Sequence, residues 1–214
     1  MKFSEDCRLC PRLANFLDEV KESHPDYHAK PVSPFGDDSP KLLVVGLAPG
    51  MHGANRTGRP FTGDHAGILL YETLYKFGFS SQAASEKGDA LVLKGCRITN
   101  AVKCLPPQNK PDTAEIRQCN AYLAQEIADL DRGSAILALG TIAHNAVLSA
   151  LKLKAKDYPF GHGSIHDLPG GFGLCDSYHC SRYNTQTRRL TRGMFEAVFE
   201  NIRRMSACHT STSG

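Results

Sequence analysis

A chain of 214 residues has the length of one domain and can bury a core without disulfide or metal staples. Its 41% hydrophobic and 22% charged residues exclude wholesale disorder, and no apolar run approaches the roughly 18 residues of a membrane span. A net charge of +3 is too small to indicate a polyanionic partner. The first residues, MKFSEDCRLC, are charged and lack the apolar core of a signal peptide, so we expect a cytoplasmic protein.

The predicted elements alternate between helices and strands along the chain. A short helix over about 13–21 comes first, and a Pro- and Gly-rich loop leads to KLLVVG, a buried strand that ends at Gly46. A Gly-rich loop from Gly50 to Asp64 follows. The remaining predicted elements are a helix over 68–77, a strand over 96–102, a helix over 113–130, a strand over 134–140, a helix over 144–153, a strand over 172–179 and a basic helix over 187–205.

This alternation predicts an α/β fold. We expect a three-layer α/β/α sandwich around a central, mostly parallel four-stranded sheet, because unbroken apolar strands suit a sheet that helices cover on both faces. Residues 1–205 are predicted to form a single domain, and residues 206–214 a polar, disordered C-terminal tail. In such sheets ligands bind beyond the carboxyl ends of the strands, so the loops after the strands are the candidate sites.

The loop after the first strand reads GLAPGMHGANRTGRPFTGD. It has neither the spacing of a phosphate-binding P-loop nor the three glycines of a dinucleotide fingerprint, which leaves nucleotide hydrolysis and nicotinamide chemistry without support. It does contain two arginines, Arg56 and Arg59, one aromatic residue, Phe61, and one carboxylate, Asp64. Glycines let backbone approach a ligand, and the aromatic ring offers a stacking face. A surface loop with turn glycines and solvated arginines is the alternative.

Two further strand ends carry polar side chains. Asn100 follows the second strand, and its amide can pair with the edge of a base, although an asparagine that caps its own turn is the alternative. His179 follows the fourth strand and can hold or donate a proton near neutral pH, although a lone histidine is often structural. Between Arg182 and Arg204 there are six arginines and two glutamates, an excess that could follow phosphates or form a solvated helix face.

The eight cysteines indicate a metal centre. A disulfide framework is a poor explanation without a secretory signal, and the apolar surroundings of Cys96 and Cys175 predict buried core thiols. The remaining pattern is two pairs, a C-x2-C pair near the N-terminus and a pair separated by fourteen residues, formed by Cys7, Cys10, Cys104 and Cys119. Four thiolates could hold structural zinc or an iron–sulfur cluster, and the spacing leaves that choice open.

Taken together, the first loop, the NAVKC segment, the SYH segment and the four spaced cysteines resemble the iron–sulfur uracil-DNA glycosylases, and the first loop is similar to the family 5 (type B) signature. The resemblance runs from Cys7 to about Thr191. It implies a uracil-DNA glycosylase-like fold and a DNA repair enzyme, a monomeric glycosylase associated with the nucleoid. Its partner would be DNA with uracil or other deaminated bases such as hypoxanthine, and the product an abasic site.

The resemblance also implies roles for individual residues. The 4Fe-4S cluster ligands are Cys7, Cys10, Cys104 and Cys119. The base contacts are made by Leu47, Ala48, Phe61, Asn100 and His179, and the catalytic set is Asp64, Asn100 and His179. The DNA contacts are made by Arg56, Arg59, Arg182, Tyr183 and Arg188.

The sequence departs from the wider family at several positions. Leu47 and Ala48 stand where most glycosylase families place an acidic residue, which fits the type B branch and leaves open which group handles the water. Cys180 stands where many relatives have proline, and Tyr183 stands where glutamine is usual. Two other functions remain open: an iron–sulfur redox protein, and a non-catalytic metal-containing protein that binds nucleic acid.

Overall fold

In the computed structural model, which describes the backbone of residues 3–210 and the side chains of residues 3–205, six strands form one sheet. The strands are β1 (Phe35–Gly36), β2 (Leu42–Gly46), β3 (Cys96–Asn100), β4 (Ala135–Leu139), β5 (Ile165–Leu168) and β6 (Phe172–Ser177). Their spatial order is β1-β3-β2-β4-β6-β5. The helices are α1 (Pro11–Ser23), α2 (Ala54–Thr57), α3 (His65–Lys76), α4 (Thr113–Ala128), α5 (Thr141–Ala150), α6 (Arg182–Gln186) and α7 (Arg192–Thr210).

The four central strands, β3, β2, β4 and β6, are mutually parallel, which confirms the predicted α/β class. The predicted count of four strands omitted the two edges. β1 pairs with β3 and β5 pairs with β6, both antiparallel. β1 has only two residues and β5 has a largely exposed pattern, so neither shows the apolar run that marks the central strands in the sequence.

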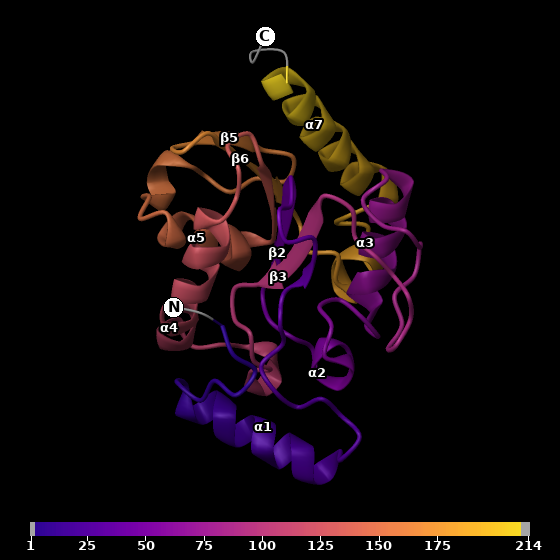
Figure 1. Ribbon diagram of the computed structural model, residues 1–214, viewed down its shortest axis with the longest axis vertical. Coiled ribbons are helices and arrows are strands. Elements are labelled where there is room, and N and C mark those ends of the chain that lie inside the picture. Colours follow the sequence, from indigo (N-terminus) through magenta and orange to yellow (C-terminus); the bar gives the residue numbers. More distant parts are fainter. Residues whose placement is uncertain (1–2, 211–214) are drawn as a thin grey trace.

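Helices cover both faces of the sheet (Figure 1). Leu42 and Val44 of β2 pack into one buried cluster with α3 and α7, whereas Leu43 and Val45 pack into a second cluster with α4 and α5. The alternation follows from the strand period, because successive side chains point to opposite faces. Helix α1 lies beyond the sheet, at the bottom of the view, and packs in a third cluster with the segment that follows β3.

The C-terminal region differs from the predicted single helix over 187–205. It forms α6 and α7, separated by a turn in which Arg188 has a φ of 57°. The backbone oxygen of Thr191 accepts a hydrogen bond from the amide of Phe195 at 3.1 Å, and its hydroxyl one from that of Met194 at 3.3 Å, so α7 has its own start. The backbone of α7 continues through part of the predicted tail to Thr210, and residues 211–214 lie outside the described residues. None of the helices in the described part of the chain has the length and apolar character that a membrane span requires.

Candidate functional site

The loop after β2 turns back over the end of its own strand. Phe61, in its second half, is 7% exposed and adopts a left-handed backbone conformation with a φ of 54°, which is rare for a bulky residue. Two hydrogen bonds hold this conformation: the Tyr71 hydroxyl donates to the carbonyl of Pro60 at 2.9 Å, and the Thr57 hydroxyl donates to that of Thr62 at 3.1 Å. The surrounding loop therefore fixes where the Phe61 ring lies.

Two site residues, Asn100 and Phe61, both approach Gly46, the last residue of β2. A Cβ atom at this position would lie 2.4 Å from Oδ1 of Asn100 and 2.6 Å from Cζ of Phe61. Asn100 is the residue paired with Gly46 in the parallel register of β2 and β3. The close contacts show that only glycine lets the Asn100 amide and the Phe61 ring approach each other here.

The Asn100 side chain is 3% exposed, and its Oδ1 atom has no hydrogen-bond partner in the protein. Nearly all buried polar atoms are paired, so an unpaired carbonyl oxygen in a cavity wall marks a position where a ligand can donate. An amide or imide N–H group is a donor of the required kind. The alternative, an asparagine that caps its own turn, has no hydrogen bond to support it.

His179 reaches the same place from β6. Its ring stacks on Phe61 with centroids 5.9 Å apart and an interplanar angle of 29°. The side-chain amide of Asn184 donates to the His179 carbonyl at 2.8 Å and ties the loop to α6. Burial lowers the pKa of His179 to about 4, because the charged imidazolium loses its hydration there. The ring is therefore neutral at physiological pH and carries one N–H donor.

β4 leaves room for this approach. Its carboxyl end is followed by Gly140, with a φ of 98°, and a Cβ atom there would lie 3.6 Å from Cβ of His179. The amide of Gly140 donates to the carbonyl of Ser177 at 2.8 Å. The β6 loop therefore crosses the end of β4 and brings His179 to the loop after β2.

Asp64 is the carboxylate of the site and also the N-cap of α3. Its Oδ1 atom accepts a hydrogen bond from the amide of Gly67 at 2.9 Å. A Cβ atom on Gly53 would lie 2.5 Å from Oδ2, so the glycines of the loop let the backbone pack directly against the carboxylate. Burial raises the pKa of Asp64, and the hydrogen bonds from the amides of Gly67 and Ala66 oppose that rise.

These side chains border one cavity of about 340 Å³, a size within the usual range of small-ligand sites. It is lined by Leu47, Ala48, Gly50, Ala54, Phe61, Asp64, Ala66, Asn100, Asn109, His179 and Ser181. All six residues that the sequence predicted for catalysis or base contact therefore line the same cavity. Phe61 and Asp64 also border a wider groove of about 840 Å³.

Two polar residues of the cavity were missed by the sequence reasoning. Asn109 lies in a single 3₁₀ turn (Pro107–Asn109) after β3 and has a φ of 57°. Ser181 is the N-cap of α6, and its hydroxyl accepts a hydrogen bond from the amide of Asn184 at 3.4 Å. The available signals were a Pro-Pro-Gln-Asn turn in a strand-end loop and a serine directly before a short helix.

Four of the five residues predicted to contact DNA are exposed, and the fifth is held in an ion pair. Arg182 and Tyr183 open α6 beside the cavity, and the Tyr183 side chain is 70% exposed, which is unusual for a large aromatic residue. Arg56 and Arg188 are also exposed. Arg59 instead forms an ion pair with Asp89, and the structure does not bring it to the cavity.

The four predicted metal ligands come together at a second place in the molecule, away from the cavity described above. Cys7 and Cys10 precede α1, Cys104 follows β3, and Cys119 lies on α4. All four are free thiols. They line one small cavity whose remaining walls are mainly apolar, among them Leu9, Leu13, Ala14, Val102 and Tyr122.

The surroundings of these thiols fit a metal centre. Burial raises the pKa of Cys119 to about 11, so its thiolate needs a nearby positive charge, as a metal supplies. The Lys103 amide donates to its sulfur at 3.3 Å, and the Tyr122 hydroxyl donates to the Cys7 sulfur at 3.3 Å. Four thiolates in a small, mainly apolar cavity are a donor set that suits either a zinc ion or an iron–sulfur cluster.

Comparison with known proteins adds an independent observation. A model of the uracil DNA glycosylase superfamily matches residues 33–203. The chain is 47% identical over 206 residues to a type-5 uracil-DNA glycosylase of Thermus thermophilus, with 94% of each chain covered. It is 39% identical over 211 residues to a type-5 uracil-DNA glycosylase of Mycobacterium leprae, covering 94% of this chain and 91% of the relative. A type-4 uracil-DNA glycosylase of Pyrobaculum aerophilum is 35% identical over 142 residues, 64% of this chain and 65% of the relative.

Proposed function

Because the chain belongs to the uracil-DNA glycosylase superfamily and, within it, to the type-5 uracil-DNA glycosylases, we propose that it excises uracil from DNA. The reaction is hydrolysis of the N-glycosidic bond, which leaves an abasic site. The observation that carries this proposal is the cavity in which Phe61, Asn100 and His179 meet above Gly46. It combines a stacking surface, an unpaired acceptor and a neutral donor, which are the groups that a flat pyrimidine requires.

A base inside a duplex cannot reach such a cavity, so the nucleotide must first rotate out of the helix. This costs a few kcal/mol, and less for a mispair such as uracil opposite guanine. The exposed ring of Tyr183 and the neighbouring Arg182 lie at the start of α6, next to the cavity residue Ser181. We assign them to the minor groove, where they would occupy the gap that the extruded base leaves.

Once the base is in the cavity, Phe61 stacks on it and Asn100 accepts a hydrogen bond from its N3–H group. Cleavage places negative charge on the leaving uracil and positive charge on the sugar. The neutral His179 ring donates its N–H to a uracil oxygen, and such a donor aimed at developing charge is typically worth 10²–10³ in rate.

Asp64 is assigned to the sugar side of the bond. Among the described residues that line the cavity, Asp64 is the one with an acidic side chain, and Leu47 and Ala48 present apolar walls. In its ionised form it orients the attacking water or stabilises the cationic sugar. The apolar wall at residues 47 and 48 lacks a group that would reject other bases, so we propose that hypoxanthine is also excised. Undetectable turnover of hypoxanthine-containing DNA would count against this breadth.

We propose that Cys7, Cys10, Cys104 and Cys119 hold a 4Fe-4S cluster. It supplies a structural cross-link between the segment before α1, the segment after β3 and α4, and no step of the reaction passes through it. The small, mainly apolar cavity that all four cysteines line and the similarity to the type-5 uracil-DNA glycosylases support this assignment. The enzyme is predicted to act as a monomer, which size-exclusion chromatography with light scattering will check.

The test is release of base from a labelled duplex with a single U·G pair, followed by alkali, which cuts the strand at abasic sites. We expect strand cleavage by the cluster-loaded protein and a loss of about 10²-fold or more in His179→Ala. His52→Ala, at an exposed histidine outside the cavity, serves as the matched control and should retain full activity. Absence of cleavage by protein with a full iron content would contradict the proposal.

A further inference from the structure

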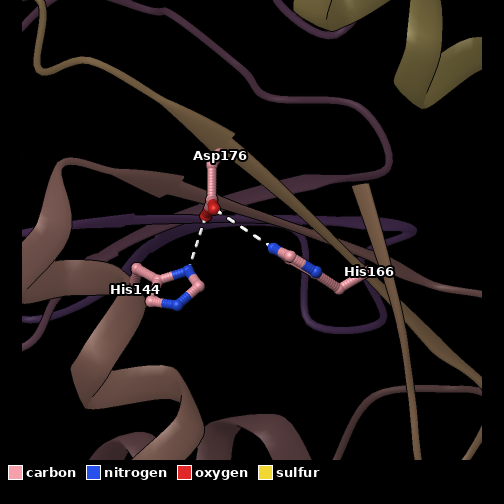
Figure 2. Close-up of side chains that lie close together, drawn as sticks. All are labelled: His144, His166 and Asp176. Atoms are coloured by element: carbon pink, nitrogen blue, oxygen red, sulfur yellow. Dashed lines mark hydrogen bonds and ion pairs between the residues drawn. The ribbon is translucent and has the colours of Figure 1, made fainter. Parts of the chain in front are cut away.

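A second group of ligand-type side chains lies apart from both sites described above. His144 of α5, His166 of β5 and Asp176 of β6 converge from three different elements (Figure 2). Their ring nitrogens and carboxylate oxygen lie within 4.8 Å of one another. His144 and Asp176 are fully buried. Neither the proposed reaction nor the cysteine site uses any of the three.

The hydrogen bonds of His144 define which of its nitrogens carries a proton. Nε2 lies 2.9 Å from the carbonyl oxygen of Tyr158, and because a carbonyl only accepts, Nε2 must carry hydrogen. In the neutral ring Nδ1 then presents its lone pair, and Nδ1 lies 2.7 Å from Oδ1 of Asp176. A lone pair that faces a carboxylate oxygen requires a positive species at that place, either a proton or a metal ion.

A proton shared by His144 and Asp176 does not account for the position of His166. Its Nε2 atom lies 3.4 Å from Oδ2 of Asp176, is buried, and has no hydrogen-bond partner. A proton between His144 and Asp176 satisfies those two residues but leaves the His166 nitrogen without a hydrogen bond. Two ligands with metal bonds of about 2.0–2.1 Å at a tetrahedral angle lie about 3.4 Å apart, which is the spacing found between His166 and Asp176.

We propose that His144, His166 and Asp176 form a binding site for one zinc-type divalent ion. Two imidazoles and one carboxylate are a ligand set that zinc accepts, with water as the fourth ligand. The outer contacts also suit a metal site: the Nε2–H of His144 donates to a carbonyl, and the amide of Gly161 donates to Oδ2 of Asp176 at 3.3 Å. The His144–Asp176 spacing must widen by about 0.6 Å to admit the ion.

The place of the site in the fold defines what the ion does. Asp176 lies on β6, three residues before His179, and the ion joins this strand to edge strand β5 and to α5. Phe160 packs edge-on against His144 with ring centroids 5.6 Å apart. The ion therefore stabilises the strand that leads to His179, and it takes no part in the chemistry.

The experiment measures zinc and iron in the same sample by mass spectrometry. Cluster-loaded protein is incubated with zinc chloride, desalted and analysed, alongside His166→Asn and the control His52→Asn at an exposed histidine. We expect about one zinc per chain in the wild type and the control, and at least about tenfold less in His166→Asn, with iron equal in all three. Because zinc binds the folded state, it should raise the unfolding midpoint of the wild type and leave that of His166→Asn unchanged.

Three results would overturn the site. The first is no zinc retained by the wild type. The second is equal zinc in the wild type and His166→Asn, which indicates an adventitious ion only. The third is zinc that rises as iron falls, which places it on the cysteines. If His166→Asn does not fold, His166→Gln replaces it, because Gln also removes the ring nitrogen while keeping a polar side chain. None of these readouts depends on glycosylase activity.

Discussion

In the proposed reaction, Asp64 combines a structural and a chemical role in one carboxylate. One oxygen caps α3 through the amide of Gly67, and the residue also lines the cavity. Burial raises the pKa of Asp64, which shows that its charged form is poorly hydrated and therefore available to interact with a nearby cation or water. Asparagine keeps the capping oxygen and removes the charge, so one substitution separates the two roles.

We expect Asp64→Asn to slow single-turnover base excision at least about tenfold while DNA affinity changes by less than about twofold. The matched control is Asp112→Asn, the same replacement at the N-cap of α4, away from the cavity. Rapid-quench kinetics and fluorescence anisotropy measure the rate and the affinity. An unchanged rate in Asp64→Asn would assign the water to another group.

His179 makes stability depend on pH. Its pKa falls from an ordinary value of about 6.5 to about 4 in the fold, so between these values the unfolded chain binds the extra proton. The stabilisation is complete above pH 6.5 and is lost as the pH falls toward 4. Between pH 7.5 and pH 5 the free energy of unfolding of the wild type should fall by on the order of 2 kcal/mol more than that of His179→Asn, because asparagine at position 179 does not titrate. Urea unfolding at both pH values measures the difference, and equal losses would contradict a buried neutral histidine.

The site depends on how each element ends. Strands β2 and β4 stop at glycines, which gives Phe61, Asn100 and His179 the space to meet. Asp64 and Ser181 are the N-caps of helices α3 and α6, so capping and site residues coincide. The break between α6 and α7 releases the exposed Tyr183 segment from the long C-terminal helix. The helix predicted from residue 187 therefore begins only at Arg192, because a turn follows the end of α6 at Gln186 and Thr191 precedes the first residue of α7.

Gly46→Ala tests the end of β2. Its added Cβ would overlap Asn100 and Phe61, so we expect the rate of uracil excision to fall at least about tenfold. Gly193→Ala on α7 is the control, because nothing lies within 4 Å of its Cβ position and alanine favours a helix. Single-turnover rates on U·G duplexes measure the effect. Full activity in Gly46→Ala would mean that the site tolerates a side chain between Asn100 and Phe61.

At the scale of the whole molecule, the cysteine site connects parts of the chain that are distant in sequence. Helix α1 lies beyond the sheet and packs in a small cluster of its own with the segment after β3 and with α4 (Figure 1). One guanidinium, that of Arg12, adds a polar link from α1 to Glu115 at 2.7 Å. A proposed cluster that cross-links these segments would supply much of the remaining cohesion.

We expect Cys104→Ala to lose most of its iron and to unfold at a temperature several degrees lower, because removal of a structural metal centre withdraws binding energy from the folded state. Cys175→Ala is the control, since Cys175 is also buried but belongs to the core cluster of the sheet, not to the cluster that contains Cys104 and Cys119. Iron analysis and differential scanning calorimetry give the two readouts. Full iron content in Cys104→Ala would remove this residue from the ligand set.

The sequence by itself determined the α/β class, the four parallel strands and the loops that carry the site. Central strands such as β2 and β4 are recognisable because burial on both faces requires an unbroken apolar run. Motif residues could be placed at strand ends because parallel strands share one carboxyl edge. The two edge strands were not predictable, since short, half-exposed strands have no distinctive pattern.

Only the tertiary structure decided which polar residues share a cavity and which do not. Asn109 and Ser181 join the site, and Arg59 pairs with Asp89 instead, because those contacts link positions far apart in the chain. The His144–His166–Asp176 group has no motif spacing at all. It exists because α5, β5 and β6 pack together, and such long-range packing leaves no periodic trace in the sequence.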